Sequence, residues 1–161
     1  MIKMIVMDVD GTLKDGKIYI GSNGELMKAF DVKDGYAIHK LLAQKEILPV
    51  IITGRTSEIV TRRCEELGIK EIHQGCLNKS EKMIEIATKN NVAINSDGII
   101  EDCAYIGDDI IDIPGMKISG ISACPSDAVD EVKMISDYVC VKRGGDGAVR
   151  EFIEWLIKNQ K

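Results

Sequence analysis

The N-terminal segment Ile2–Thr12, with the sequence IKMIVMDVDGT, decides the fold. The apolar, β-branched run Ile2–Asp8 predicts a buried strand, and Asp8 and Asp10 follow where that strand should end. Side chains at i and i+2 of an extended chain share a face, so both carboxylates can point into one site. Gly11 then allows the backbone to turn and approach a ligand closely. Because two neighbouring carboxylates repel each other and lose water, the pair predicts a site for a divalent cation.

Strand-like and helix-like segments alternate along the rest of the chain. This alternation predicts a three-layer α/β/α, Rossmann-like domain over residues 1–161 with a mostly parallel sheet. A β-hairpin with a glycine-rich tip is expected within residues 17–30. Further strands are expected at Ile47–Thr53, Glu71–His73, Ala104–Gly107, Ile121–Ala123 and Tyr138–Val141. Helices are expected from Asp34, from a cap at Thr56 or Ser57 to near Leu67, and over Lys79–Asn90, Ile110–Ser119, Asp127–Ser136 and Gly147–Asn159.

Composition excludes several classes of function. The 161 residues are 45% hydrophobic and 29% charged, as in ordinary globular domains. The net charge of −5, without a basic stripe interleaved with aromatics, disfavours nucleic-acid binding. No run approaches the roughly 20 apolar residues that cross a bilayer, and no signal peptide precedes Asp8. The five cysteines lack metal-ligand spacing, which indicates reduced, mostly buried thiols and a cytoplasmic location.

Polar residues gather where the predicted strands end. Thr53-Gly54-Arg55 follows the second core strand and Asp108-Asp109 the fourth, while Lys79 begins a helix. Ligands of such α/β folds bind beyond the carboxyl ends of the strands, so these residues are expected to share one site with Asp8 and Asp10. Three carboxylates, those of Asp8, Asp10 and Asp108, suit Mg²⁺. The chain's two histidines, His39 and His73, lie outside this cluster, which disfavours zinc.

This set of residues can carry phosphoryl transfer. A carboxylate beside a metal-held phosphate can attack phosphorus and form an aspartyl-phosphate. A second carboxyl group two residues on can protonate the leaving oxygen and later activate water. Lys79 and the Thr53 hydroxyl can neutralise and hydrogen-bond the transferring oxygens. Each of these residues alone is weak evidence for phosphoryl transfer, but their joint order along the chain is a specific signal for it.

The four segments resemble the motifs of the haloacid dehalogenase superfamily of phosphotransferases. They are Asp8-Val9-Asp10-Gly11-Thr12, Thr53 in Ile52-Thr53-Gly54-Arg55, Lys79, and Gly107-Asp108-Asp109-Ile110-Ile111-Asp112. The resemblance implies that Asp8 is the nucleophile, Asp10 the general acid/base, and Thr53 and Lys79 the phosphate binders. It implies Asp8, Asp10 and Asp108 as Mg²⁺ ligands, with Asp10 binding through its backbone carbonyl, and Asp109 and Asp112 as outer-shell groups.

Only about forty residues separate Asp10 from Thr53, too few for a cap domain. Segments 15–19, 28–36, 74–75 and 143–151 resemble the capless subgroup that includes 3-deoxy-D-manno-octulosonate 8-phosphate (KDO 8-phosphate) phosphatases. The resemblance implies a phosphorylated sugar acid as substrate, a site that includes Gly54, and a homotetramer in which hairpin 17–30 packs on a neighbour. Arg55 and Arg143 are expected to bind the carboxylate or phosphate of the sugar; for Arg55, an ordinary surface ion pair is an equal alternative.

Three alternatives remain open from the sequence. The substrate can instead be the 9-phosphate of a nine-carbon acid such as KDN or N-acetylneuraminate. The chain can be a non-catalytic oligomerisation module related to the C-terminal domains of acylneuraminate cytidylyltransferases, although the complete motif set argues against this. A phospho-acceptor signalling domain is disfavoured, because such domains carry their aspartate on a later strand.

Overall fold

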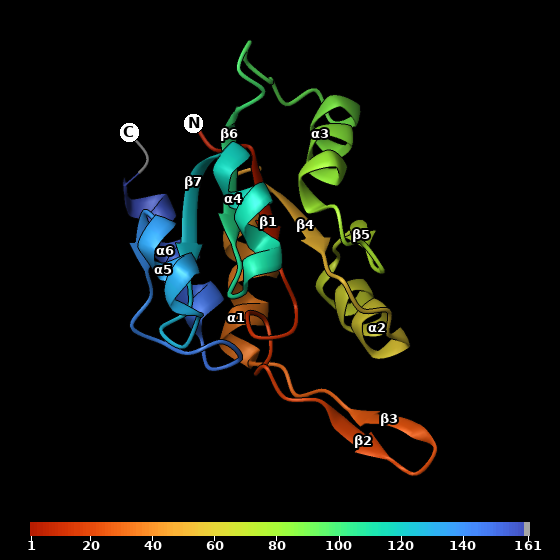
Figure 1. Cartoon of the computed structure of the whole chain (residues 1–161). Coiled ribbons are helices and arrows are strands. Elements are labelled where there is room, and N and C mark those ends of the chain that lie inside the picture. The colour runs from red at the N-terminus through yellow and green to blue at the C-terminus, as the bar shows by residue number, and fades with distance from the viewer. Residues whose placement is uncertain (160–161) are drawn as a thin grey trace.

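Six parallel strands form the central sheet of the computed structural model, which describes residues 1–159 (Figure 1). The strand order is β5-β4-β1-β6-β7-β8, and all neighbouring pairs are parallel. The first strand therefore lies in the middle of the sheet, with neighbours on both sides. The strands are β1 Met4–Met7, β4 Leu48–Ile52, β5 Glu71–His73, β6 Ile100–Ile106, β7 Ser119–Cys124 and β8 Tyr138–Val139. This arrangement confirms the predicted α/β class.

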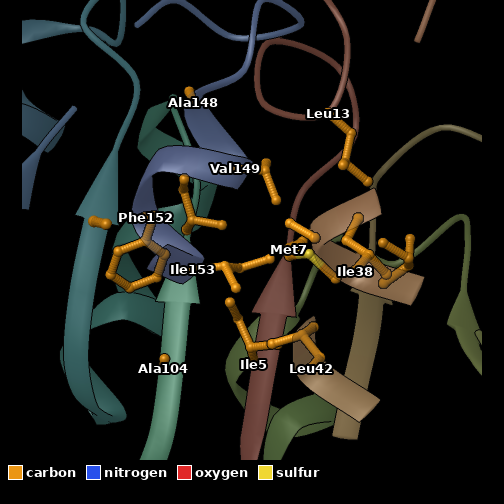
Figure 2. Packing of buried hydrophobic residues seen from close by; sticks show 14 of the residues in the cluster. Ile5, Met7, Leu13, Ile38, Leu42, Ala104, Ala148, Val149, Phe152 and Ile153 are labelled. Carbon is orange, nitrogen blue, oxygen red and sulfur yellow. The ribbon is translucent and has the colours of Figure 1, made fainter. Parts of the chain in front are cut away.

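Helices cover both faces of this sheet, which explains why β1 is apolar at every position. Ile5 and Met7 face one core, and Met4 and Val6 face the other. Figure 2 shows Ile5 and Met7 packed among side chains of the first face. That face carries α1 Val32–Tyr36, the π-helix η1 Ala37–Leu42, α2 Glu58–Leu67 and α6 Ala148–Asn159. The opposite face carries α3 Lys79–Lys89, the 3₁₀ turn η2 Ile110–Asp112, α4 Ile113–Ile118 and α5 Asp130–Ile135.

A two-stranded antiparallel hairpin projects away from these layers (Figure 1). It consists of β2 Tyr19–Gly21 and β3 Gly24–Met27, joined in the register Tyr19↔Met27. Its apolar side chains are largely in solvent: Ile20 is 69% exposed and Leu26 67%. Between Asp10 and β4 the chain forms only this hairpin and the α1–η1 segment, so no cap domain is present there. The capless prediction is confirmed.

The prediction of Asp34 as a helix cap is wrong, whereas Ser57 has the predicted N-cap position but makes no capping hydrogen bond through its side chain. The first helix begins at Val32, because the extended Asp31 accepts hydrogen bonds from the N–H groups of Lys33 and Asp34. Asp34 is instead buried and accepts a hydrogen bond from Arg150 N at 2.7 Å. Ser57 occupies the N-cap position of α2, but its hydroxyl donates to Glu25 in the hairpin. In both cases the polar side chain bonds a partner that is distant in the sequence and does not cap its own helix.

The cysteines agree with the prediction of reduced thiols. All five are free, and Cys64, Cys103, Cys124 and Cys140 are buried. Burial raises the pKa of the Cys64 thiol to about 11, so it stays protonated. Among residues 1–159, no helix has the length and apolarity needed to cross a membrane.

Candidate active site

The predicted site residues meet in a cleft at the carboxyl ends of β1, β4 and β6. The cleft has a volume of about 320 Å³. Its lining includes all the predicted site residues except Asp112 and Arg143, together with Leu77 and Ile111. The members predicted from the sequence are Asp8, Asp10, Thr53, Gly54, Arg55, Lys79, Asp108 and Asp109. The parallel sheet brings these residues together from four separate segments of the chain.

Lys79 forms the electrostatic centre of the site. Its side chain is fully buried, and its Nζ lies 2.7 Å from Asp8 Oδ1 and 2.7 Å from Asp112 Oδ1. Burial alone would lower the pKa of Lys79, but the charges of the two carboxylates outweigh it and raise that pKa above its ordinary value. Lys79 is therefore a permanent ammonium group at the base of the cleft.

Asp8 is buried, Asp108 is half-buried, and their carboxylates lie close together in the cleft. Burial, followed by repulsion from Asp112, raises the pKa of Asp8, and Lys79 only partly opposes this. Burial, followed by the charge of Asp8, raises the pKa of Asp108. Carboxylate oxygens of Asp8, Asp108 and Asp112 lie within 4.8 Å of one another. A divalent cation would offset both the lost hydration and the repulsion, so this donor set fits Mg²⁺.

Asp112 holds the site together rather than lining it. Its Oδ1 accepts from Lys79 and from the Tyr105 hydroxyl, and its Oδ2 accepts from the backbone N–H groups of Asp108 and Asp109. With both oxygens engaged in this way, Asp112 is poorly placed to bind a metal directly. The capacity to hold a cation therefore falls mainly on Asp8 and Asp108. Asp109 is an N-cap, with Oδ1 2.7 Å from Ile110 N.

The loop after β1 approaches Asp108 so closely that only glycine fits. Gly11 has a φ of +92°, and a Cβ there would lie 2.0 Å from Asp108 Oδ2. The Thr12 hydroxyl lies 3.4 Å from Asp108 Oδ1. This close approach is what places Asp8 and Asp10 beside the acid from β6.

The carboxylate of Asp10 lies outside the group of three acids. Its Oδ1 accepts a hydrogen bond from Lys28 at 3.0 Å, and the Asp10 side chain is 21% exposed. Lys28 is not among the predicted site residues, because it lies at the base of the hairpin, 18 residues away from its partner. Its only signal in the sequence is a cation within the otherwise apolar run Leu26–Phe30 of the expected hairpin. The backbone-carbonyl ligand role of Asp10 stays a prediction.

The two arginines lie at the periphery. Arg55 lines the cleft with an exposed side chain. Arg143 is outside the cleft lining, 68% exposed and 3.4 Å from Asp127 Oδ2. Its loop nevertheless packs on the site, because Gly145 N donates to the carbonyl of Thr12 at 3.0 Å. Within one chain the structure brings Arg55, but not Arg143, to the predicted substrate site.

The two histidines take no part in the cleft. His39 Nδ1 lies 3.0 Å from the carbonyl of Leu67, and His73 Nε2 lies 3.0 Å from Glu71 Oε2. Their positions confirm that they stand apart from the acidic cluster.

Comparisons with known proteins identify close relatives over nearly the whole chain. The chain is 42% identical over 159 residues to the 3-deoxy-D-manno-octulosonate 8-phosphate phosphatase KdsC of Escherichia coli K12, covering 99% of this chain and 81% of that protein. The Haemophilus influenzae KdsC is 37% identical, with 99% and 84% covered. No family model matches.

Solved structures give the same result. The Moraxella catarrhalis 3-deoxy-D-manno-octulosonate 8-phosphate phosphatase, in complex with a magnesium ion, a phosphate ion and KDO, has a TM-score of 0.90 and is 40% identical. The match covers 99% of this chain and 87% of that one. The cobalt-bound Haemophilus influenzae phosphatase has a TM-score of 0.89 at 36% identity, with 98% and 88% covered.

Proposed function

Because the chain belongs to the KdsC family of 3-deoxy-D-manno-octulosonate 8-phosphate phosphatases, in the haloacid dehalogenase superfamily, we propose that it hydrolyses the phosphomonoester of KDO 8-phosphate with Mg²⁺. The observation that carries the proposal is the buried Asp8–Lys79–Asp112 ion-pair chain at the base of a cleft that also contains Asp108. It combines a nucleophile, a fixed positive charge and a cation-binding acid in one place.

Asp8 is the proposed nucleophile. Lys79 holds it through Oδ1, and we assign the attack on phosphorus to Oδ2. The new Oδ2–P bond forms as the ester P–O bond breaks, which gives an aspartyl-phosphate. Water then attacks that phosphorus, the Asp8–phosphorus bond breaks, and phosphate leaves with Asp8 regenerated.

Asp10 is the proposed general acid and base. It lines the same cleft as Asp8. In the first step its carboxyl proton passes to the oxygen of the leaving sugar alcohol, and in the second it accepts a proton from the attacking water. Thr53 and Lys79 bind the phosphate oxygens throughout.

Mg²⁺ would be held by the carboxylates of Asp8 and Asp108 and the backbone carbonyl of Asp10, with Asp109 and Asp112 in the outer shell. When bound, the ion neutralises charge on the transferring phosphate and suppresses repulsion between the acids. We assign recognition of the sugar acid to Gly54, Arg55 and Arg143, with Arg143 meeting substrate at the rim.

We further propose one hydrolase domain over residues 1–161, a reducing, cytoplasmic setting, and a homotetramer assembled through hairpin 17–30. The exposed Ile20 and Leu26 of the hairpin support the assembly, because a two-stranded hairpin is marginal without a partner surface. Light scattering after size exclusion tests it, with Ile20→Lys/Leu26→Lys as the disrupted form. A monomeric wild type would overturn the tetramer.

The decisive experiment is phosphate release from KDO 8-phosphate, KDN 9-phosphate and N-acetylneuraminate 9-phosphate, each with Mg²⁺ and with EDTA. We expect the highest kcat/KM with KDO 8-phosphate, loss of turnover in EDTA, and no turnover by a folded Asp8→Asn variant. A preference for a nine-carbon substrate would replace the substrate assignment. No release from any of the three would reject the phosphatase itself.

A further inference from the structure

The base of the hairpin contacts the loop of Asp10 through one buried lysine, Lys28. Lys28 Nζ lies 3.0 Å from Asp10 Oδ1 and 3.1 Å from Glu25 Oε2. The Lys28 side chain is only 2% exposed, although the neighbouring strand β3 is exposed throughout. An ammonium group is rarely buried unless it is paired, so the two carboxylates account for its position.

Glu25 connects this lysine to a second loop of the site. Its Oε1 accepts a hydrogen bond from the Ser57 hydroxyl, two residues after Arg55. The hydrogen bonds from Ser57 and then Lys28 lower the pKa of Glu25, which keeps it ionised. Glu25 and Lys28 therefore connect the loop of Asp10 to the loop that follows β4 through a chain of polar contacts.

Lys14 does not replace Lys28 as a donor to Asp10. Its Nζ lies 3.5 Å from Asp10 Oδ1. The three protons of its ammonium group are directed to the carbonyl and Oδ1 of Asp15 and to the carbonyl of Lys17. Lys28 thus supplies the hydrogen bond that fixes the Asp10 carboxylate.

On the basis of the function proposed above, we propose that Lys28 is a positioning residue for proton transfer. It holds Asp10 by Oδ1, which leaves Oδ2 to carry the proton. As the ester P–O bond breaks, the proton on Oδ2 passes to the leaving oxygen, and both electrons of the broken bond stay on that oxygen. Lys28 itself is tied to two carboxylates, so it does not need to meet substrate.

The test exploits the leaving group. A sugar alcohol is a poor leaving group and needs a proton from a general acid, whereas p-nitrophenolate leaves without one. We would measure kcat/KM for KDO 8-phosphate and for p-nitrophenyl phosphate with the wild type, Lys28→Met and Asp10→Asn. Because kcat/KM covers steps up to the first irreversible one, it reports the step that needs the acid.

For Lys28→Met we expect a loss of about 10- to 100-fold on the sugar phosphate, a part of the 10²–10⁴ that a positioned acid contributes. On p-nitrophenyl phosphate the same variant should lose less than about threefold, and Asp10→Asn should show the same contrast more strongly. Lys28→Arg, which keeps a donor, should recover part of the sugar-phosphate activity. Lys45→Met, at an exposed position away from the cleft, should leave both rates unchanged.

Equal losses of kcat/KM on both esters for Lys28→Met would show that Lys28 has only a structural role and would overturn the inference. A rise in KM for the sugar phosphate at unchanged kcat would show direct substrate binding, which also overturns it. If Asp10→Asn lost both activities equally, the proposed acid role of Asp10 would fail first. Circular dichroism of each variant identifies any misfolded form, and Lys28→Arg then carries the test.

Discussion

Asp112→Asn should weaken the fold sharply, because four donors converge on this one carboxylate. Lys79 Nζ and the Tyr105 hydroxyl donate to Oδ1, each at 2.7 Å. The backbone N–H groups of Asp108 and Asp109 donate to Oδ2 at 2.9 and 3.1 Å. Asp112 has no exposed surface, so bulk water cannot replace a lost acceptor.

The magnitude follows from the acceptors that asparagine lacks. The amide preserves the shape but presents an NH₂ group where two of the four donors now meet an oxygen. Hydrogen bonds to charged groups contribute about 1.5–3 kcal/mol each. Removing one partner of a buried ion pair costs about 3–5 kcal/mol. Because Lys79 keeps its second partner, Asp8, we expect the free energy of unfolding to fall by about 3–5 kcal/mol rather than more.

Urea unfolding followed by circular dichroism in EDTA measures this loss without a contribution from bound metal. The matched control is Tyr105→Phe, which removes one neutral donor and should cost about 1 kcal/mol. A loss below about 1 kcal/mol for Asp112→Asn, or one no larger than that of the control, would refute the reasoning.

Three other predictions follow from burial and close contact. Mg²⁺ affinity should rise from about pH 6 to pH 8, because burial, and then the charge of Asp8, raises the pKa of Asp108. A proton must leave Asp108 before the metal binds. An affinity that calorimetry finds independent of pH would contradict this. Gly144→Ala should cost about 1–3 kcal/mol in urea unfolding, because its Cβ would lie 1.9 Å from the Gly11 carbonyl oxygen. The control Gly16→Ala has its nearest neighbour 3.9 Å away, so equal losses would count against the close-contact argument. Burial raises the pKa of Asp34 from 3.8 to about 6, so the folded chain retains a proton and Asp34 costs about 3 kcal/mol of stability as pH rises through this window. Relative to wild type, Asp34→Asn should therefore be more stable at pH 7 than at pH 4, and an equal difference at both pH values would exclude the buried charge as the cause.

The features predicted well are those that depend on neighbouring residues in the chain. The apolar run ending at Asp8 predicts a buried central strand, because a strand covered by helices on both faces needs apolar side chains on both. In the structure the side chains of β1 pack into both cores. The carboxyl ends of parallel strands necessarily share one edge of the sheet. The joint placement of Asp8, Thr53 and Asp108 in one cleft therefore follows from local patterns alone.

The failures concern polar side chains whose partners are distant. The sequence predicts Asp34 as a helix cap, but its carboxylate instead accepts a hydrogen bond from Arg150 N, 116 residues away. Ser57 occupies its expected position but bonds Glu25, 32 residues away. A short polar side chain satisfies a local cap or a distant donor equally well, and sequence spacing does not distinguish the two.

The sequence by itself therefore determines the α/β class and the acids at the ends of β1 and β6, because strand burial and strand-end chemistry are local properties. Only the tertiary structure decides that Asp112 organises Lys79, and that Lys28 is the group holding Asp10. Those contacts depend on where the base of the hairpin meets the loop of Asp10 and on how α3 packs against the sheet. Excluding water strengthens the attraction between the paired charges, and no single segment of the chain can exclude water alone.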